Sequence, residues 1–384
     1  MSIDFMEITL NKNCGLYIHV PFCRKRCNYC NFFFTTNTKL TNSFVEALIL
    51  EMSYYSKILN NKIFDTIYFG GGTPSVLHPD SVRYIINQAT SLFNFVSLSE
   101  VTLECNPEDM IQHKASDYRA AGVNRLSIGI QSFNTRDLKF LTRQHTPESA
   151  SRVISEVKES FDNFTLDLIY SLPEQTLETL EKNICSFINH SPPHISAYLL
   201  TYEDKTPLFK SLTSGHFKQN SDDKESEFYL YLSDRLRKEG YIHYEVSSFC
   251  KPGFEAKHNS KYWLGNDYLG LGPAAHSLIN SSRFSNLRSV VDYCKNLGNG
   301  KSVIDSVHKL FEREKAEEEI MLKLRSFGIS NKKLNKLLNS EADNFLMQLL
   351  NDGYAIRNGE KISLTPKGFL ISDTIISKLT GYLN

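Results

Sequence analysis

Short β-branched and aromatic runs alternate with longer amphipathic runs from residue 15 to residue 200, and this rhythm limits the fold more than any other feature of the chain. The runs typical of strands are residues 16–20, 66–69, 101–104, 125–131, 166–170 and 194–200. Apolar residues at helical spacing fill the intervals, at residues 45–55, 81–92, 116–121, 147–157 and 177–188. Roughly six βα units in succession predict an α/β fold with a parallel sheet covered by helices.

The rhythm alone does not separate an open sheet from a barrel. The glycine-rich and polar segments described below end successive predicted strands, which is where active sites lie in βα barrels. A barrel is therefore the favoured architecture. After residue 200 the pattern loosens, with a polar linker over 213–224, a helix over 225–239 and a strand over 241–247.

From residue 311 the composition changes again. Charged residues at 312–319 begin a helix, a second helix follows at 343–350, and Asn358-Gly359 is a strong signal for a hairpin turn. This order predicts a smaller α+β, winged-helix-like C-terminal domain. The chain is thus expected to divide into residues 1–212, 213–304 and 305–384.

The charge balance gives no support for a nucleic-acid or anionic-membrane partner, because Lys+Arg and Asp+Glu are both 43. Lys332, Lys333 and Lys336 can touch nucleic acid, but a solvated helix face is the better interpretation. No apolar run reaches transmembrane length, and residues 1–7 lack the basic and apolar regions of a signal peptide. Scattered cysteines outside the motif described next fit a reducing compartment, so we expect a cytoplasmic protein.

Cys23, Cys27 and Cys30 lie on one short segment with the spacing Cys-x3-Cys-x2-Cys. Three thiolates on one loop can hold three corners of a 4Fe–4S cubane, which leaves the fourth iron open to an exchangeable small molecule. A structural zinc site fits less well, because such sites fill four positions with paired ligands and no nearby CxxC partner is visible. An odd number of cysteines suits a disulfide poorly. The segment therefore predicts an iron–sulfur cluster.

Further segments end predicted strands with groups suited to a small ligand. Gly70-Gly71-Gly72-Thr73-Pro74-Ser75 can bring bare backbone close to a ligand, although a phosphate cradle or a tight turn uses the same residues. Glu104 can accept both hydroxyls of a ribose, with a strand-end salt bridge as the alternative. Gln131 and Arg143 offer polar contacts, the guanidinium to a carboxylate, and Asp167 lies within the fifth strand.

Together these segments resemble the radical S-adenosylmethionine (SAM) superfamily, and within it the family of oxygen-independent coproporphyrinogen III oxidase (HemN) and the related haem chaperone HemW. The resemblance covers most of the chain from about Gly15 and implies a partial (βα)6 barrel with the three cysteines on the cluster. It implies SAM contacts at Tyr17, Tyr29, Gly72, Thr73, Glu104, Gln131, Arg143 and Asp167. The departures are few: Thr142, Ser171 and Ala274 stand where glycine is usual, and Cys105 where a small residue is usual.

Three features bear on the branch of the family. The oxidase branch has one more cysteine two positions after the third and a long N-terminal arm, whereas this chain has Phe32 there and 22 residues before Cys23. His258-Asn259-Ser260-Lys261-Tyr262-Trp263 matches the HNxxYW motif that the resemblance associates with haem binding. A neutral imidazole is a good axial ligand and aromatic rings can pack on a porphyrin. His258 is therefore predicted to ligate haem iron, with Tyr262 and Trp263 beside it; a helix-start histidine packed by aromatics is the alternative.

The resemblance thus implies a haem chaperone that carries a SAM-coordinated 4Fe–4S cluster and passes haem to an acceptor protein, for example a membrane-bound respiratory enzyme. Homodimerisation is a further implication. Two enzymatic activities are the alternatives: oxidative decarboxylation of coproporphyrinogen III, and methylation or degradation of haem by a radical SAM relative. The residues leave open the acceptor, the fate of SAM and whether haem attachment is covalent.

Overall fold

The computed structural model describes residues 13–110 and 113–384, so residues 1–7, considered above for a signal peptide, lie outside the described residues. Six parallel strands follow one another in the order of the chain: β1 (Cys14–Val20), β2 (Ile63–Gly71), β3 (Asn94–Cys105), β4 (Arg125–Gln131), β5 (Phe164–Tyr170) and β6 (His194–Leu199). Every residue of β4 is buried, as expected for a central parallel strand covered on both faces. All six predicted strands are confirmed.

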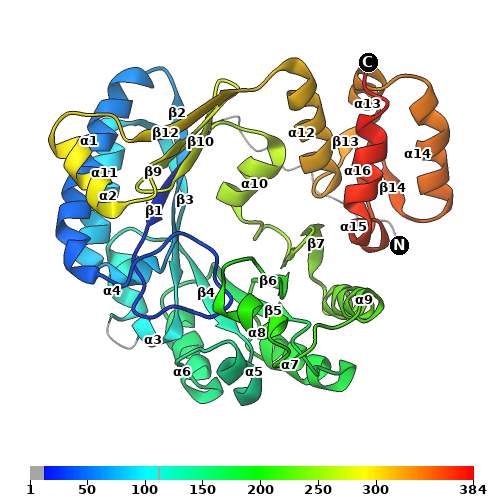
Figure 1. Cartoon of the computed structure of the whole chain (residues 1–384), viewed down its shortest axis with the longest axis horizontal. Helices are drawn as coiled ribbons and strands as arrows, with labels where there is room; N and C mark the ends of the chain where they lie inside the picture. The colour runs from blue at the N-terminus through cyan, green and yellow to red at the C-terminus, as the bar shows by residue number, and fades with distance from the viewer. Residues whose placement is uncertain (1–12, 111–112) are drawn as a thin grey trace.

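Helices connect these strands and lie on the outer side of the arc that the strands form (Figure 1). They are α1 (Thr41–Ile58), α2 (Pro79–Leu92), α3 (Pro107–Met110), α4 (Ala115–Ala120), α5 (Thr135–Phe140), α6 (Pro147–Lys158) and α7 (Leu177–Asn189), with the 3-10 turns η1 (Thr38–Leu40) and η2 (Pro74–Val76). Local sequence sets their starts: Thr146 and Thr176 cap α6 and α7 through side-chain hydrogen bonds. The helices bury their apolar faces against the strands.

The barrel is partial because β1 and β6 pair with other strands instead of with each other. Strand β9 pairs in parallel with β1, and β8 pairs antiparallel with β6. The added strands are β7 (Ile242–Glu245), β8 (Ser248–Cys250), β9 (Tyr268–Leu271), β10 (His276–Ile279), β11 (Ser282–Asn286) and β12 (Ile304–Lys309). One 12-stranded sheet therefore spans the boundary expected at residue 212, and the division of the chain into three segments stays a prediction.

Three helices accompany the added strands: α8 (Pro207–Thr213), α9 (Asp222–Lys238) and α11 (Val290–Gly298). Helix α9 begins inside the predicted linker, because the Ser221 side chain caps it and acidic residues occupy its first turn. A fourth helix, α10 (Lys257–Leu264), carries the HNxxYW segment. It contacts β1, β2 and β3 and lies on the inner side of the arc, within the barrel lumen (Figure 1).

The C-terminal segment forms its own small sheet in the order β13-β15-β14, packed with helices, as predicted. Its elements are α12 (Glu312–Leu324), β13 (Ile329–Ser330), α13 (Asn331–Leu337), α14 (Glu341–Asn351), β14 (Ala355–Asn358), β15 (Lys361–Leu364), α15 (Pro366–Leu370) and α16 (Ser372–Thr380). Gly359 turns the predicted hairpin with φ 55°. Among the described residues, no helix combines the length and the apolar character needed to cross a membrane.

Candidate cluster and SAM site

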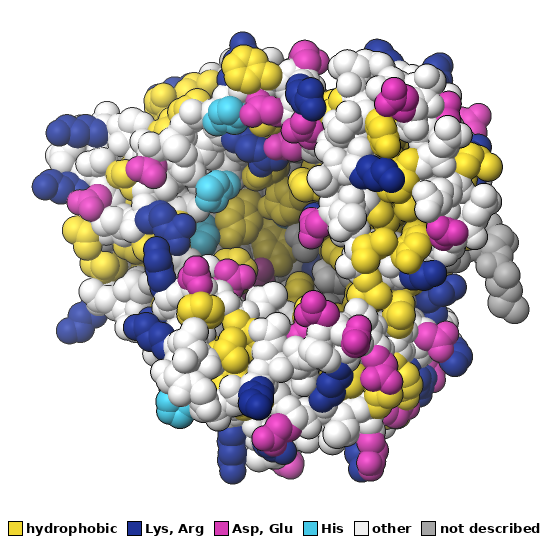
Figure 2. Space-filling model, turned by 45° about the vertical axis from the view of Figure 1, so that its right-hand side comes forward, with side chains coloured by type: hydrophobic (Ala, Val, Ile, Leu, Met, Phe, Trp, Pro, Cys, Tyr) yellow, Lys and Arg dark blue, Asp and Glu magenta, His cyan; other side chains and the backbone are white. Residues whose placement is uncertain are grey.

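A cavity of about 1020 Å³ opens at the C-terminal ends of the barrel strands. The face in Figure 2 is deeply hollowed, with apolar side chains inside and charged side chains around the rim. The cavity wall includes the three cysteines and seven of the eight predicted SAM residues: Cys23, Cys27, Cys30, Tyr29, Gly72, Thr73, Glu104, Gln131, Arg143 and Asp167. The fold thus brings together residues that are up to 144 positions apart between Cys23 and Asp167.

The base of the cysteine loop is tied to the glycine segment at the end of β2. Cys23 N donates a backbone hydrogen bond to Thr35 O (3.0 Å), which closes the loop. Thr73 N donates to Phe22 O (2.7 Å), and Thr73 Oγ1 donates to Cys23 Sγ (3.4 Å). The loop that carries the thiols and the segment predicted to contact SAM therefore hold each other in place.

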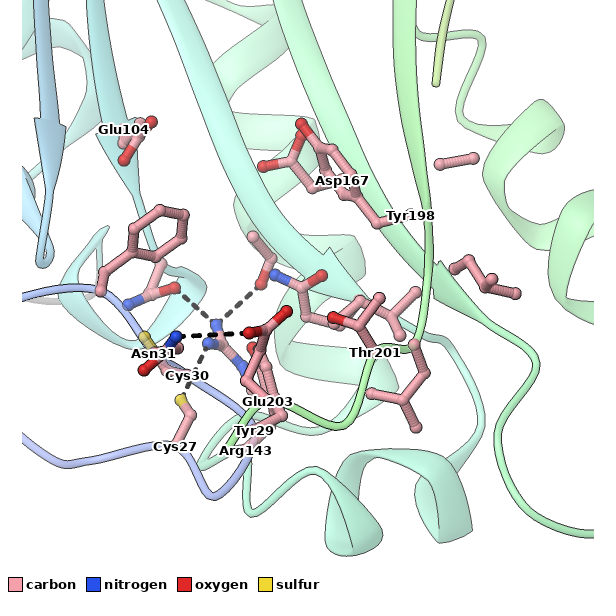
Figure 3. A pocket seen from close by; sticks show the side chains of 18 of the residues that line it. Cys27, Tyr29, Cys30, Asn31, Glu104, Arg143, Asp167, Tyr198, Thr201 and Glu203 are labelled. Carbon is pink, nitrogen blue, oxygen red and sulfur yellow. Dashed lines mark hydrogen bonds between the residues drawn. The ribbon is translucent and has the colours of Figure 1, made fainter. Parts of the chain in front are cut away.

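Arg143 connects the other side of the loop to the barrel (Figure 3). Its Nη1 donates to Cys27 Sγ (3.5 Å), and its Nη2 donates to Asn106 Oδ1 (2.5 Å) and Gly129 O (2.8 Å). Asn106 Nδ2 in turn donates to Thr73 Oγ1 (3.2 Å). Arg143 Nε is buried without a partner among the described residues, which leaves one charged donor for an anionic group of a ligand.

Two carboxylates give the inner part of the cavity its electrostatic character. Burial raises the pKa of Glu104 to about 7, and the Tyr68 hydroxyl, which donates to Glu104 Oε1 at 2.7 Å, acts against that rise. Burial also raises the pKa of Asp167 to about 6, while Ser127 Oγ donates to its Oδ2 at 3.3 Å. A ligand that offers positive charge or hydroxyl donors would favour the ionised form of both groups.

The residues present fit a cubane cluster with SAM. Burial raises the pKa of Cys23 to about 12 and raises the pKa of Cys30, so metal binding there would release protons. A Cβ on Gly72 would lie 2.7 Å from Phe22 O, so only bare backbone fits between the loop and the cavity. Within the described residues no three metal-binding side chains converge on a single ion. A cubane does not require this, because its three cysteines bind three different irons.

Four predicted ligand residues lie away from the cavity wall. The Tyr17 ring stacks on Tyr68, and its hydroxyl lies 3.1 Å from His19 Nδ1. His258 Nε2 and the Tyr262 hydroxyl are hydrogen-bonded to each other in the barrel lumen. The partly buried Trp263 packs against the apolar cluster that contains Phe327. Their predicted contacts, with SAM for Tyr17 and with haem for the others, stay predictions.

The structure also shows site residues that the sequence analysis did not single out. Asn106 links Thr73 to Arg143, and its place at the end of a predicted strand was the available signal. Tyr198 lies beside Asp167 on the wall, and it is 45% exposed because its ring faces the open cavity (Figure 3). Phe369 and Leu370 of α15 complete the wall from the C-terminal segment. No local pattern pointed to these two residues, since only the tertiary fold brings α15 to the barrel.

Comparison with known proteins bears on the family to which the chain belongs. A model of the radical SAM superfamily matches residues 17–184. Heme chaperone HemW of Lactococcus lactis is 33% identical over 376 residues, covering 96% of this chain and 98% of its own. Heme chaperone HemW of Bacillus subtilis is 30% identical over 375 residues, covering 96% of this chain and 99% of its own.

The fold has a solved counterpart. Coproporphyrinogen III oxidase (HemN) from Escherichia coli, described as a radical SAM enzyme, superposes with a TM-score of 0.80 over 98% of this chain and 92% of its own. The two sequences are 21% identical, so this likeness concerns the fold alone, and it confirms the predicted α/β architecture. The extent of the sequence matches decides the rest: the chain belongs to the radical SAM superfamily and, within it, to the HemW family.

Proposed function

We propose that the chain is a haem chaperone that binds haem and transfers it to an acceptor protein, with a 4Fe–4S cluster on Cys23, Cys27 and Cys30 and SAM in the adjoining cavity. The observation that carries the proposal is the convergence of these thiols with seven predicted SAM residues on one cavity, in a chain of the HemW family. The proposal includes a cytoplasmic location, a cluster-dependent homodimer and an acceptor such as a membrane-bound respiratory enzyme. The five cysteines outside the proposed cluster site are free thiols, which agrees with a reducing compartment: Cys14, Cys105, Cys185, Cys250 and Cys294.

When bound, the cluster would supply one electron to the sulfonium of SAM. The chain's own residues would position SAM: Glu104 accepts from the ribose hydroxyls, and the free Arg143 Nε donates to the carboxylate. Because Gly72 has no Cβ, the segment that would contact the methionine part lies directly against the start of the cysteine loop. The walls of the cavity limit the access of water to these groups.

Haem ligation by His258, with Tyr262 and Trp263 beside the porphyrin, belongs to the same proposal and requires a rearrangement. His258 is 0% exposed, and its Nε2 lies 2.8 Å from the Tyr262 hydroxyl. An iron that bound Nε2 would have to replace this hydroxyl, so α10 would move away from β2 as haem enters. A histidine held in this way binds iron more slowly than an exposed one.

The experiment is a haem titration of the anaerobically reconstituted protein, read at the Soret band, for wild type and His258→Ala. Saturable binding of one haem by the wild type supports the chaperone proposal. A loss in His258→Ala that added imidazole restores supports direct ligation by His258. Failure of the wild type to bind haem refutes the proposal. Product formation from coproporphyrinogen III with SAM and a reductant, assayed on the same preparation, would assign the oxidase reaction instead.

A further inference from the structure

Helix α10 brings His258 into the barrel lumen, where its ring has one orientation. Nδ1 lies 2.9 Å from Thr66 Oγ1 on β2, and Nε2 lies 2.8 Å from the Tyr262 hydroxyl one turn further along the helix. The helix start is fixed as well, because Glu100 of β3 accepts from the backbone N–H of Lys257 (2.8 Å) and of His258 (3.0 Å). Both ring nitrogens and the backbone of the residue are therefore satisfied without any ligand.

The ring belongs to a stack that ends at the SAM site. The His258 imidazole stacks on Tyr68 with ring centroids 5.1 Å apart and an interplanar angle of 28°. Tyr17 stacks on the same tyrosine ring at 6.1 Å and 26°. Tyr68, held by two rings, donates its hydroxyl hydrogen to Glu104 Oε1 at 2.7 Å. A hydrogen bond weakens steeply when its angle departs from the optimum, so the orientation of Tyr68 decides the strength of this contact.

The hydrogen bond from Tyr68 favours the ionised form of Glu104, as does a hydrogen bond from the backbone of Gly71. Burial raises the pKa of Glu104 to about 7, and the hydrogen bond from Tyr68 is the largest influence that lowers it. If the Tyr68 ring tilted away, the pKa would rise further and the carboxyl group would be protonated at neutral pH. A protonated carboxyl has fewer free lone pairs to accept from the two ribose hydroxyls.

We propose that His258 is a positioning residue of the SAM site: it holds the Tyr68 ring so that the tyrosine hydroxyl fixes the Glu104 carboxylate for the ribose of SAM. The HNxxYW segment thus affects SAM binding indirectly, through Tyr68 and Glu104, without touching SAM or the cluster. This inference rests on the SAM site of the proposed function and requires no haem.

Strand β6 offers a matched control. His194 is 1% exposed, its Nδ1 lies 3.0 Å from Thr165 Oγ1, and its Nε2 lies 2.8 Å from the Tyr244 hydroxyl. Like His258, it is buried and has a threonine hydroxyl at Nδ1 and a tyrosine hydroxyl at Nε2. Its ring lies against Tyr244, however, and not against the tyrosine that binds Glu104. A loss that is only structural should therefore be similar for the two histidines.

The test measures SAM affinity of the reconstituted full chain by equilibrium dialysis, with the SAM-dependent change in the EPR spectrum of the reduced cluster as a second readout. We expect His258→Ala to raise the Kd for SAM about tenfold, as for the loss of a hydrogen bond to a charged group, and to diminish the EPR change. His194→Ala should change the Kd by less than about twofold. In a Tyr68→Phe background, which lacks the hydroxyl, His258→Ala should have little further effect.

Equal SAM affinity of wild type and His258→Ala, or full additivity with Tyr68→Phe, overturns the inference. If His258→Ala fails to assemble the cluster, His258→Gln keeps a hydrogen-bonding group opposite Thr66, removes the ring and answers the same question. Haem is titrated in parallel at the Soret band. Loss of haem binding with unchanged SAM affinity overturns the positioning role, whereas a wild type that binds SAM but no haem refutes only the haem proposal.

Discussion

Three residues have left-handed backbone at the positions where the family resemblance led us to expect glycine. The φ angles are 56° at Thr142, 62° at Ser171 and 60° at Ala274. This region costs a residue with a Cβ roughly 1–2 kcal/mol. Thr142 recovers part of that cost, because its Oγ1 accepts from Asn28 N on the cysteine loop at 3.1 Å. The methyl group of Ala274 cannot form a hydrogen bond that would offset this cost. The position where the family resemblance led us to expect glycine is therefore a site of backbone strain.

Ala274→Gly is expected to raise the free energy of unfolding by up to about 1 kcal/mol, because relief of the left-handed strain exceeds the loss of one buried methyl group. The free energy of unfolding should be about 1 kcal/mol lower for Thr142→Gly than for Ala274→Gly, since the Thr142 substitution also removes the acceptor for Asn28 N. Chemical denaturation of the two variants and the wild type measures both changes. A destabilisation by Ala274→Gly would show that the strain argument is wrong.

Glu51 is a buried carboxyl whose protonation should be visible in stability. It is 1% exposed in α1, and burial raises its pKa to about 7 although Gly272 N, the Asn286 amide and the Tyr293 hydroxyl donate to it. The folded state therefore keeps a proton that the unfolded state has lost. Stability contributed by this group is complete below the unfolded pKa of about 4.5 and is lost as pH rises to about 7.

The free energy of unfolding should accordingly fall by about 3 kcal/mol more between pH 4.5 and pH 7 than it does in Glu51→Gln, which cannot titrate. Denaturation at a series of pH values measures the two slopes, and only their difference is attributed to Glu51. Glu148→Gln serves as the control, because Glu148 is an exposed carboxyl at the start of α6. Parallel pH profiles of wild type and Glu51→Gln would contradict this assignment.

At the level of elements, the packing of α10 against β1 depends on Gly15. A Cβ at Gly15 would lie 2.9 Å from His258 Cε1 and 3.2 Å from Lys261 Cδ. We expect Gly15→Ala to displace α10 and to lower the free energy of unfolding by about 1–3 kcal/mol, the usual cost of overpacking. Hydrogen exchange should show loss of protection that begins at α10. Gly298→Ala in α11, where the new methyl meets nothing within 4 Å, should have no such effect.

The same helix shows where sequence reasoning stopped. The parallel strands were predictable because each is a short β-branched run followed by an amphipathic helix, and β4 was predicted with the bounds that the structure has. The strands β8 to β12 have three to six residues and alternate little, so no periodic signal announced the sheet extension. A helix that fills a barrel lumen carries polar groups such as His258 toward other polar groups. Its sequence therefore resembles that of a surface helix.

At the scale of the whole molecule, the candidate site was predictable where its residues lie in strand-end segments and not where the tertiary fold supplies them. The cavity wall combines the cysteine loop, the ends of β2 to β6, α9 and α15. Nothing in the local sequence indicates that α15 lines the same cavity as Tyr229 and Ser247. The wall therefore depends on the docking of the C-terminal segment, and ligand binding should stabilise that docking.

One long-range consequence joins the two proposed ligands. Nε2 of His258 is hydrogen-bonded to Tyr262, and its ring stacks on Tyr68. If Nε2 bound haem iron, His258 would have to leave the position in which it supports the SAM site. Two ligands that require different positions of one residue bind antagonistically, and linkage demands the same factor in both directions. We expect saturating SAM to raise the Kd for haem about tenfold, and haem to raise the Kd for SAM equally.

Soret titrations with and without SAM, and dialysis of SAM with and without haem, measure the two factors on protein with an oxidised cluster, so that SAM is not consumed. His194→Ala should retain the antagonism, because the ring of this histidine lies against Tyr244 and its nitrogens lie against Thr165 and Tyr244. Haem that still binds His258→Ala should do so independently of SAM. A haem affinity of the wild type that does not change with SAM would separate the two sites, and haem would then be held without moving His258.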